Sequence, residues 1–409
     1  MASVMGCPRG ERNKMTLHHA SRTGQQGGDG LVRVPDAVLA AITARAGEAD
    51  RHSIEGVRRL SKLFTVGRGE LTGDYLADPG LRRAYLQYFL PVNFAKVACL
   101  LREMPSLPLR PLRILDLGSG PGVASLAVRG HIHRRQVAGQ VDTEVLAIDQ
   151  GHAALQEARA LWAITPAVVP GIRLSSMPLD VERPGKRAPW KTGRFDVIIA
   201  ANSVNELFRS TADPITRRVK LLQQLLDSMS DDGTLMIIEP ALRETTRDLH
   251  LVRDKLLSGS GCNVYSPCLH DRHCPALVHP DDWCHEERPW SPPAIVREID
   301  RKVGFIKDAL KFSYLLLRKD GRTILERAPA VYRVVSEKMV MKGEQRVWLC
   351  NEMGRQLVGR LDKASSLTNE AFDQWHRGAI VRLDEIERHG ALGRVTAGAK
   401  AELLRPADR

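Results

Sequence analysis

The spacing of apolar residues predicts helices in the first quarter of the chain. Apolar side chains recur every three to four positions from Val34 to about Leu101, which is the period of an amphipathic helix. Glycines crowd the stretch before them, over residues 24–30, and such a stretch cannot hold a regular element. We therefore expect a flexible tail over residues 1–30 and a helical region over 31–108.

After the proline-rich stretch 107–111 the pattern changes to short apolar runs separated by longer helical stretches. Runs of this kind that are apolar on both faces indicate parallel strands covered by helices on both sides. The runs cover residues 113–117, 144–149, 172–174, 195–200, 234–239 and 311–317. They predict an α/β fold, a Rossmann-like sheet over residues 109–320, with a cysteine-rich insertion over 261–300.

Beyond residue 320 the pattern is that of antiparallel strands. Residues 330–335, 345–349 and 355–361 are typical of strands, with turn residues at 342–344 and 351–354. A helix-like run follows over 369–387. We expect a small β-rich C-terminal region over 321–409 that ends in a helix.

The first expected strand runs into a glycine loop that starts at Asp116 and places glycines at Gly118, Gly120 and Gly122. Glycines at such a place let the backbone approach a ligand, and the helix that follows presents free N–H groups. The dinucleotide fingerprint would need a glycine at Val123 instead. The form acidic-x-G-x-G-x-G resembles the S-adenosylmethionine loop of class I methyltransferases.

Further positions fit the same cofactor. Asp149 ends the second expected strand, 27 residues beyond Gly122, and a carboxylate there can accept both ribose hydroxyls. Asp180 lies where this fold commonly contacts the adenine, and Asn202 follows the fourth strand at the reactive end of the cofactor. Asn202 or Glu206 would lie near a methyl acceptor. No pattern identifies a catalytic base, so the catalytic residue is left unassigned.

Four of the seven cysteines lie between positions 262 and 284. No apolar secretory segment precedes them, and such a cluster inside a cell is more often a metal or redox site than a disulfide framework. Cys268, Cys274 and Cys284 have the spacing C-x5-C-x9-C and fit a [4Fe–4S] cluster or a zinc ion, each of which needs a fourth ligand. The candidates for that ligand are Cys350, Cys262, His270, His273, His279 and His285.

Composition and charge narrow the class of protein. With 43% hydrophobic and 26% charged residues, the chain is globular rather than disordered or fibrous. No stretch approaches the roughly 18 unbroken apolar residues of a membrane helix, so we expect no membrane partner. The net charge is +5 over residues 1–100, −1 over 101–300 and +8 over 301–409. Basic flanks around a neutral centre suit a polyanion such as nucleic acid, although an arginine-rich composition without that partner is the alternative.

These features together resemble the methyltransferase-like family of small-ribosomal-subunit assembly proteins, best known from mitochondria and with bacterial members. The resemblance covers roughly residues 70–385, and its most specific part is the cysteine pattern with a late fourth cysteine. It is carried by the glycine loop 116–122, Ile238-Glu239-Pro240, Pro267-Cys268-x-His270, Cys274-Pro275, Trp283-Cys284-His285, Lys311-Phe312-Ser313-Tyr314 and Leu349-Cys350. The chain departs from the family at Leu269, where proline is usual, and at Glu286, where an aromatic residue is usual.

The resemblance implies a class I methyltransferase-like domain with bound S-adenosylmethionine. It also implies a [4Fe–4S] cluster, with zinc as the alternative, on Cys268, Cys274, Cys284 and Cys350. The implied partner is small-subunit rRNA or the assembling small ribosomal subunit. Three readings stay open: a methyltransferase acting on rRNA or protein, a non-catalytic rRNA-binding assembly factor, and a zinc-stapled methyltransferase of another substrate. We expect a monomer when free, in a bacterial-type cytoplasm or, alternatively, the mitochondrial matrix.

Overall fold

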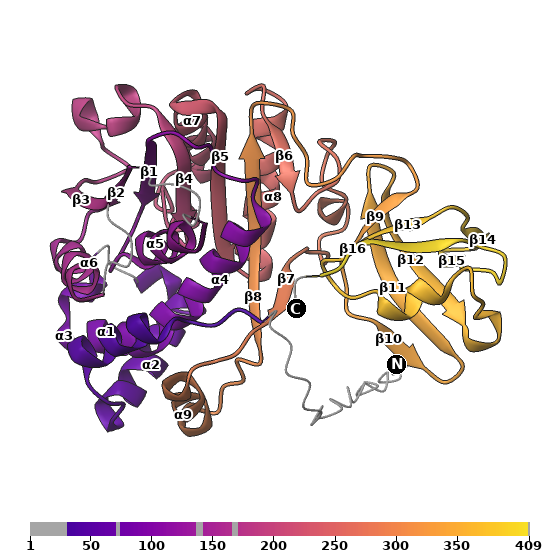
Figure 1. Ribbon diagram of the computed structural model, residues 1–409, viewed down its shortest axis with the longest axis horizontal. Helices are drawn as coiled ribbons and strands as arrows, with labels where there is room; N and C mark the ends of the chain where they lie inside the picture. Colours follow the sequence, from indigo (N-terminus) through magenta and orange to yellow (C-terminus); the bar gives the residue numbers. More distant parts are fainter. Residues whose placement is uncertain (1–30, 71–73, 136–141, 166–170, 408–409) are drawn as a thin grey trace, which may run out of the picture. The chain divides into compact units, whose positions relative to one another are not determined.

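The central sheet has the strand order β3-β2-β1-β4-β5-β8-β6, with β7 paired to β8 beside this path (Figure 1). The first five strands are parallel, whereas β8 runs antiparallel to β5. The strands are β1 Leu112–Leu117, β2 Thr143–Asp149, β3 Ile172–Pro178, β4 Phe195–Ala201, β5 Met229–Pro240, β6 Asn263–Ser266, β7 Glu286–Pro289 and β8 Ala309–Arg318. This order, with one reversed strand between β5 and β6, is that of class I methyltransferases. The expected fold class is confirmed.

The computed structural model describes residues 31–70, 74–135, 142–165 and 171–407. From Leu31 onward the chain is one compact unit. The tail expected over residues 1–30 lies outside the described residues.

Helices cover both faces of the central sheet. Neighbouring side chains of a strand point to opposite faces, and Ile114 of β1 accordingly joins one core while Leu115 joins the other. The first core includes residues of α4 and α5, and the second includes residues of α7 and α8. The helices that follow β1 are α5 Val123–Arg135, α6 His152–Ile164, α7 Pro214–Asp227, α8 Arg243–Leu257 and α9 Ala294–Val303.

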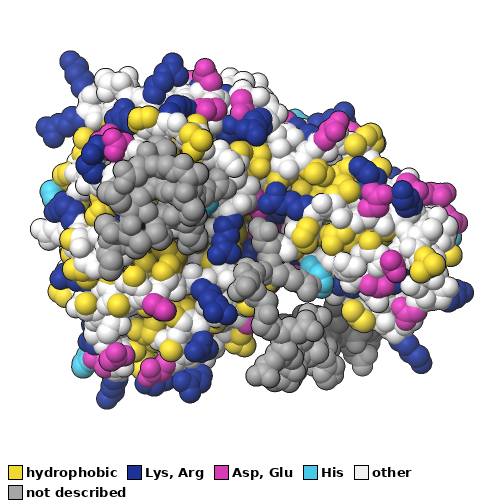
Figure 2. Space-filling model, viewed as in Figure 1, with side chains coloured by type: hydrophobic (Ala, Val, Ile, Leu, Met, Phe, Trp, Pro, Cys, Tyr) yellow, Lys and Arg dark blue, Asp and Glu magenta, His cyan; other side chains and the backbone are white. Residues whose placement is uncertain are grey.

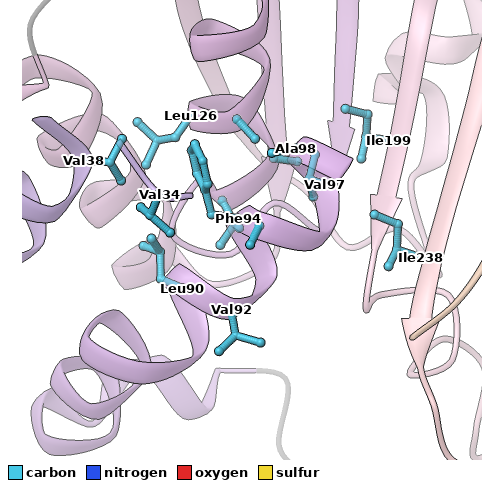
Figure 3. Close-up of a cluster of buried hydrophobic side chains, with 14 of the residues drawn as sticks. Val34, Val38, Leu90, Val92, Phe94, Val97, Ala98, Leu126, Ile199 and Ile238 are labelled. Carbon is cyan, nitrogen blue, oxygen red and sulfur yellow. The ribbon is translucent and has the colours of Figure 1, made fainter. Parts of the chain in front are cut away.

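The N-terminal region is helical, as expected. Its helices are α1 Asp36–Ala46, α2 Arg51–Phe64, α3 Pro79–Ala84 and α4 Leu90–Glu103, and a π-helical turn, Tyr85–Phe89, joins α3 to α4. Figure 3 shows Leu90, Phe94 and Val97 of α4 among the side chains that pack near Leu126 of α5 and Ile238 of β5. Helix α4 is therefore a core element that also borders the cavity described below.

The continuous helical stretch Pro79–Glu103 is long and apolar enough to cross a membrane by length and composition alone. The stretch contains no long unbroken apolar run, because polar residues such as Gln87 and Lys96 interrupt it. Its most apolar window is 83% buried within the protein, which is how the core helix of a soluble protein also behaves. The stretch is thus weak evidence for a membrane span.

Part of the expected cysteine-rich insertion belongs to the central sheet. Within residues 261–300, β6 and β7 both pair with β8, and α9 begins at Ala294. Residues 267–285 form no strand of the sheet and contain only a short 3-10 turn, Pro275–Leu277. We call residues 267–285 the cysteine loop.

The C-terminal region forms a second sheet, of order β14-β15-β12-β11-β9-β13-β16, with β10 paired to β11. Its strands are β9 Val331–Val334, β10 Met339–Met341, β11 Glu344–Asn351, β12 Gly354–Leu361, β13 Ile380–Leu383, β14 Glu387–His389, β15 Leu392–Arg394 and β16 Ala401–Arg405. The three expected strands and the turn between β11 and β12 are confirmed.

The prediction of a helix over residues 369–387 is wrong. The chain makes only a 3-10 helix, Glu370–Gln374, before it enters β13. Gly378 has a φ of 90°, which interrupts any helix. Ile380 and Val381 are buried and pair with both β9 and β16, and β-branched side chains fit such a strand better than a helix. The region ends in β16, not in a helix.

Candidate functional site

A cavity of about 430 Å³ opens at the carboxyl ends of the central strands. Strand β1 lies between β2 and β4, so the strand order turns there, and open α/β sheets bind ligands at this kind of crevice. Six of the seven predicted cofactor residues line the cavity: Asp116, Gly118, Gly120, Asp149, Asp180 and Asn202. The fold thus brings together positions that lie up to 86 residues apart in the sequence.

The three glycines of the loop serve different purposes. All have positive φ, at 67° for Gly118, 51° for Gly120 and 80° for Gly122. A Cβ on Gly118 would lie 2.6 Å from that of Ser203, and one on Gly122 would lie 3.0 Å from that of Ala158, so both permit close packing. A Cβ on Gly120 would meet nothing within 4 Å. Gly120 faces open space in the cavity, whereas Gly122 supports the helix behind it.

Asp149 joins the glycine loop to the turn after β2. One carboxylate oxygen accepts the N–H of Gly120 and the other accepts that of Gly151, each at 2.8 Å. Burial raises the pKa of Asp149, and these two N–H groups oppose that rise. Each carboxylate oxygen can accept more than one hydrogen bond. Asp149 can therefore still accept hydroxyl donors from a ligand.

Asp116 holds the start of α5 in place. Its Oδ2 accepts the backbone N–H of Ser125 at 2.9 Å and the hydroxyl of the same residue at 2.7 Å. Burial raises the pKa of Asp116 to about 6, although both of these hydrogen bonds act to lower it. Asp180 lines the cavity from the segment after β3.

The turn after β4 is held in an unusual conformation. Asn202 has a φ of 56°, in the left-handed region that residues other than glycine seldom adopt. Its N–H donates to the carbonyl of Ile238 at 2.7 Å. Glu239 accepts the N–H of Asn205 at 3.1 Å and also its side-chain amide, and Arg68 donates to the amide oxygen of Asn205.

Two buried carboxyl groups lie at this end of the cavity. Burial raises the pKa of Glu206 to about 7, with a further contribution from Asp149 and opposition from Arg68. Burial also raises the pKa of Glu239 to about 8, against the hydrogen bonds from Asn205. Glu206 lines the cavity, so it can accept or release a proton there near neutral pH.

The N-terminal helical region supplies a wall that the sequence patterns did not identify. Phe64, Tyr75, Tyr85 and Phe89 all line the cavity and contact one another through their rings, at centroid distances from 5.0 to 6.5 Å. The sequence signal for this wall was the helical spacing of Tyr85 and Phe89, which lie four residues apart. Aromatic residues at that spacing more often belong to the hydrophobic core than to a binding site.

Lysines were also missed. Lys96 of α4, Lys307 just before β8 and Lys311 within β8 line the same cavity. No local motif marks them, since Lys96 lies more than 200 residues from the other two. The cavity wall thus carries these lysines as well as carboxyl groups such as Asp149 and Glu206.

The four predicted cluster cysteines affect one another electrostatically. The pKa of Cys350 is raised by burial and then by Cys284, Cys268 and Cys274. Burial, with Cys268, raises the pKa of Cys284 to about 11, and burial with Cys268 and Cys284 raises that of Cys274. Such mutual effects require the thiols to lie near one another. The structure therefore brings Cys350 of β11 to the cysteine loop.

Cys262 behaves differently from these four. It packs in the core with α7 and α8, its thiol lies 3.1 Å from the Ser260 hydroxyl, and no thiol contributes to its raised pKa. His270 is buried, and so is His250 of α8, which the sequence patterns did not single out.

Cationic side chains surround the cysteine loop. Burial lowers the pKa of Arg253, but Cys268, Cys274 and Asp254 together raise it. Arg253 donates to the carbonyls of His270 and Arg272, so it braces the loop from α8. Arg355 and Arg377 also favour an ionised thiol, because the charge of each lowers the pKa of Cys284.

Among the residues that the structure describes, no group of three or more His, Cys, Asp or Glu side chains is placed to hold a single metal ion. Four thiolates on one zinc ion would lie about 3.8 Å from one another, from a Zn–S distance of about 2.3 Å and tetrahedral geometry. A cluster of four irons and four sulfides is larger and holds its thiolates further apart. The donor set is all thiol, as both groups accept.

The family model for the mitochondrial small ribosomal subunit protein Rsm22 matches residues 81–364, which is more than half of the chain. The chain belongs to this family. The Rsm22 match includes the glycine loop, the cysteine loop and Cys350, and so it confirms the resemblance identified from the sequence. No curated protein matches the chain.

Several solved structures are similar to the Rsm22-family chain at low identity. The plantazolicin methyltransferase BpumL in complex with SAH has 13% identity over 65% of this chain and 99% of that chain, with a TM-score of 0.33. The magnesium protoporphyrin IX methyltransferase of Synechocystis PCC 6803 with bound SAH has 13% identity over 64% and 99%, with a TM-score of 0.33. A SAM-dependent methyltransferase of Leishmania major has 12% identity over 68% and 89%, with a TM-score of 0.36. At these values the likenesses carry no argument about activity, and the fold rests on the strand order.

Proposed function

We propose that this Rsm22-family chain is an S-adenosylmethionine-binding, methyltransferase-like factor that acts on small-subunit rRNA during assembly of the ribosome. The observation that carries the proposal is the cavity at the switch point of the sheet, where Asp149 bridges Gly120 and Gly151. Membership of the Rsm22 family supplies the small ribosomal subunit as the partner.

The residues of the cavity would hold the cofactor as follows. Asp149 would accept the two ribose hydroxyls with its remaining lone pairs. Gly120 leaves room for the ligand beside the loop, and Asp180 would border the adenine. Asn202 and Glu206 would lie at the reactive end. When bound, S-adenosylmethionine supplies an activated methyl group.

This Rsm22-family chain is an enzyme only if it transfers a methyl group to an acceptor. Methyl transfer to an N–H or O–H acceptor releases a proton, and Glu206 is a group in this cavity whose pKa of about 7 suits its uptake. We propose Glu206 as the proton acceptor of a methyltransferase, with a non-catalytic assembly factor as the alternative. Deleting the gene and mapping modified nucleotides of small-subunit rRNA separates the two. A lost methyl group that Glu206→Gln fails to restore supports the enzyme, and an unchanged modification map supports the assembly factor.

We also propose that Cys268, Cys274, Cys284 and Cys350 hold a [4Fe–4S] cluster. Mutual electrostatic effects among the four thiols support a shared group, and the late fourth cysteine is the part of the sequence pattern that favours a cluster over zinc. When bound, the cluster supplies a cross-link between the cysteine loop and β11. Purification without oxygen, absorption near 400 nm, and iron, sulfide and zinc content test this. About four irons and four sulfides per chain are expected, and stoichiometric zinc would overturn it.

Binding to rRNA would use the basic flanks of the chain. The net charge of +8 over residues 301–409 supports a polyanionic partner, although Figure 2 shows Lys and Arg interspersed with Asp and Glu on the face drawn. Affinity for small-subunit rRNA should then fall steeply as salt rises. The description of the family favours the mitochondrial matrix, while the bacterial-type cytoplasm and the monomeric state stay predictions.

A further inference from the structure

Lys96 is a buried lysine in the wall of the cavity. Its side chain lies on α4, only 9% of the residue is exposed, and it lines the cavity. No hydrogen bond or ion pair of its ammonium group occurs within the described residues. A buried charge of this kind costs stability unless something pairs with it. The position is therefore hard to explain by folding alone.

The surroundings of Lys96 are basic rather than acidic. Burial lowers its pKa to about 7, and the charge of Lys307 lowers it further, while Glu239 opposes this. Glu239 is itself engaged with Asn205 through both of its oxygens, and its pKa is raised to about 8. The hydrogen bonds of Glu239 therefore go to Asn205, and none goes to Lys96.

Lys307 is the second lysine of the cavity wall. It lines the cavity, and burial lowers its pKa, with opposition from Asp300. The Asp300 carboxylate is shared, because it accepts the Tyr88 hydroxyl and the backbone N–H of Lys307. Lys311 differs, since its ammonium group pairs with Glu287 at 3.1 Å. Unlike Lys311, Lys96 and Lys307 have no ion pair among the described residues, so both can face an anionic ligand.

We propose that Lys96 and Lys307 form a phosphate subsite for a single-stranded nucleotide that enters the cavity beside the cofactor. The inference rests on the proposed function, because it takes the part of the cavity around Asp149 and Asp180 as the place of the cofactor. These carboxylates repel an anion, whereas the two lysines attract one.

A nucleotide fits the rest of the cavity better than a carboxylate-bearing peptide does. The rings of Phe64, Tyr75, Tyr85 and Phe89 line the same space, and flat aromatic side chains are the usual platform for an unstacked base. A family tied to the small ribosomal subunit meets single-stranded rRNA segments. An unpaired nucleotide would thus place its base against the rings and its phosphate at the lysines.

The cofactor offers a competing anion, its own carboxylate, and the experiment must separate the two sources. Binding of the RNA trinucleotide UUU to the full chain is measured by calorimetry with S-adenosylhomocysteine at saturation, and affinity for S-adenosylhomocysteine is measured separately. The variants are Lys96→Met and Lys307→Met. The control is Lys302→Met, on α9, whose exposed ammonium group pairs with Glu298 at 2.7 Å.

We expect each of Lys96→Met and Lys307→Met to weaken trinucleotide binding about tenfold or more, as the loss of a charge-assisted contact does, with S-adenosylhomocysteine affinity within about twofold of the parent. A trinucleotide with neutral methylphosphonate linkages should bind the parent chain as weakly as UUU binds the variants. Lys302→Met should match the parent. Removing an unpaired buried cation should also raise the melting temperature of Lys96→Met without ligand.

Two results overturn the proposal. Unchanged trinucleotide affinity in both variants removes the lysines from the subsite. Loss of S-adenosylhomocysteine affinity instead assigns them to the cofactor's carboxylate. If Lys96→Met does not fold, Lys307→Met decides alone. A parent chain that binds no S-adenosylhomocysteine contradicts the proposed function, and that result is distinct from either outcome for the lysines.

Discussion

Arg333 of β9 donates a hydrogen bond to the Glu286 carboxylate of β7 at 3.2 Å, and both side chains are buried. Glu286 also accepts from Arg288 at 2.7 Å, and Arg288 in turn donates to Glu103 of α4 at 2.9 Å. These contacts run from the C-terminal sheet, through β7, to the helix that carries Lys96. Buried ion pairs therefore surround Glu286 and join three elements of the fold.

Arg333→Met should therefore destabilise the chain strongly. It leaves Glu286 buried with one cation fewer, and removing one partner of a buried pair costs about 3–5 kcal/mol. The free energy of unfolding in urea measures the loss. Arg382→Met, which breaks the exposed pair with Glu402 on β16, is the control and should cost less than about 1 kcal/mol. Equal losses of unfolding free energy in the two variants would show that the buried pair stabilises the chain no more than the exposed pair does.

Asp149→Ala should weaken S-adenosylmethionine binding by at least about 100-fold. Two hydrogen bonds from the ribose to a charged acceptor would be lost, each worth about 1.5–3 kcal/mol. Isothermal calorimetry gives the dissociation constant. Asp142→Asn is the control. This exposed residue lies just before β2, at the end of the strand opposite to Asp149. An affinity unchanged by Asp149→Ala would remove the cofactor from this part of the cavity.

The contribution of Glu239 to the stability of the free protein should fall as pH rises from about 5 to 7, in the opposite sense to that of the buried His250 and His270. Glu239 has a pKa raised from 4.5 to about 8 by burial, so the folded state keeps a proton that the unfolded state has released. Its contribution to stability then decreases with pH, by up to about 1.4 kcal/mol per unit for one such group. Above pH 7 the lowered pKa of Lys96 opposes this trend.

Urea unfolding at a series of pH values tests the contribution of Glu239. Glu239→Gln should make the slope between pH 5 and 7 less negative, because the neutral amide cannot titrate. Glu55→Gln, on the exposed face of α2, should leave the slope as it is. An identical slope in all three proteins would mean that Glu239 is ionised in the folded state.

Cys350→Ser should abolish the absorption near 400 nm and lower the melting temperature. Its thiol would be the ligand that ties β11 to the cysteine loop, so its loss frees the loop from the C-terminal sheet. Cys262→Ser provides the matched control, because Cys262 is buried near the loop and its thiol lies 3.1 Å from the Ser260 hydroxyl. Retention of iron and sulfide in Cys350→Ser, or their loss in Cys262→Ser, would contradict the assignment of the fourth ligand.

Local sequence patterns sufficed for elements that local chemistry decides. The strand that ends at Leu117, the glycine loop after it and the hairpin of β11 and β12 all form as expected, because apolar runs and turn residues act within a few positions. The pattern over residues 369–387 predicted a helix wrongly, because it too is only a local pattern. Its helical spacing is local, but pairing of Ile380 and Val381 with β9 and β16 outweighs it, and that pairing depends on distant strands.

The sequence by itself determined the α/β class, the loop that starts at Asp116, the carboxylate Asp149 and the family. These depend on spacing along the chain. Only the tertiary structure decided that Lys96 and Lys307 share one cavity, that aromatic rings of the N-terminal helices close it, and that Glu286 is neutralised by Arg333. Contacts between residues this far apart arise when the sheet and its covering helices pack, because burial then selects which side chains face one another.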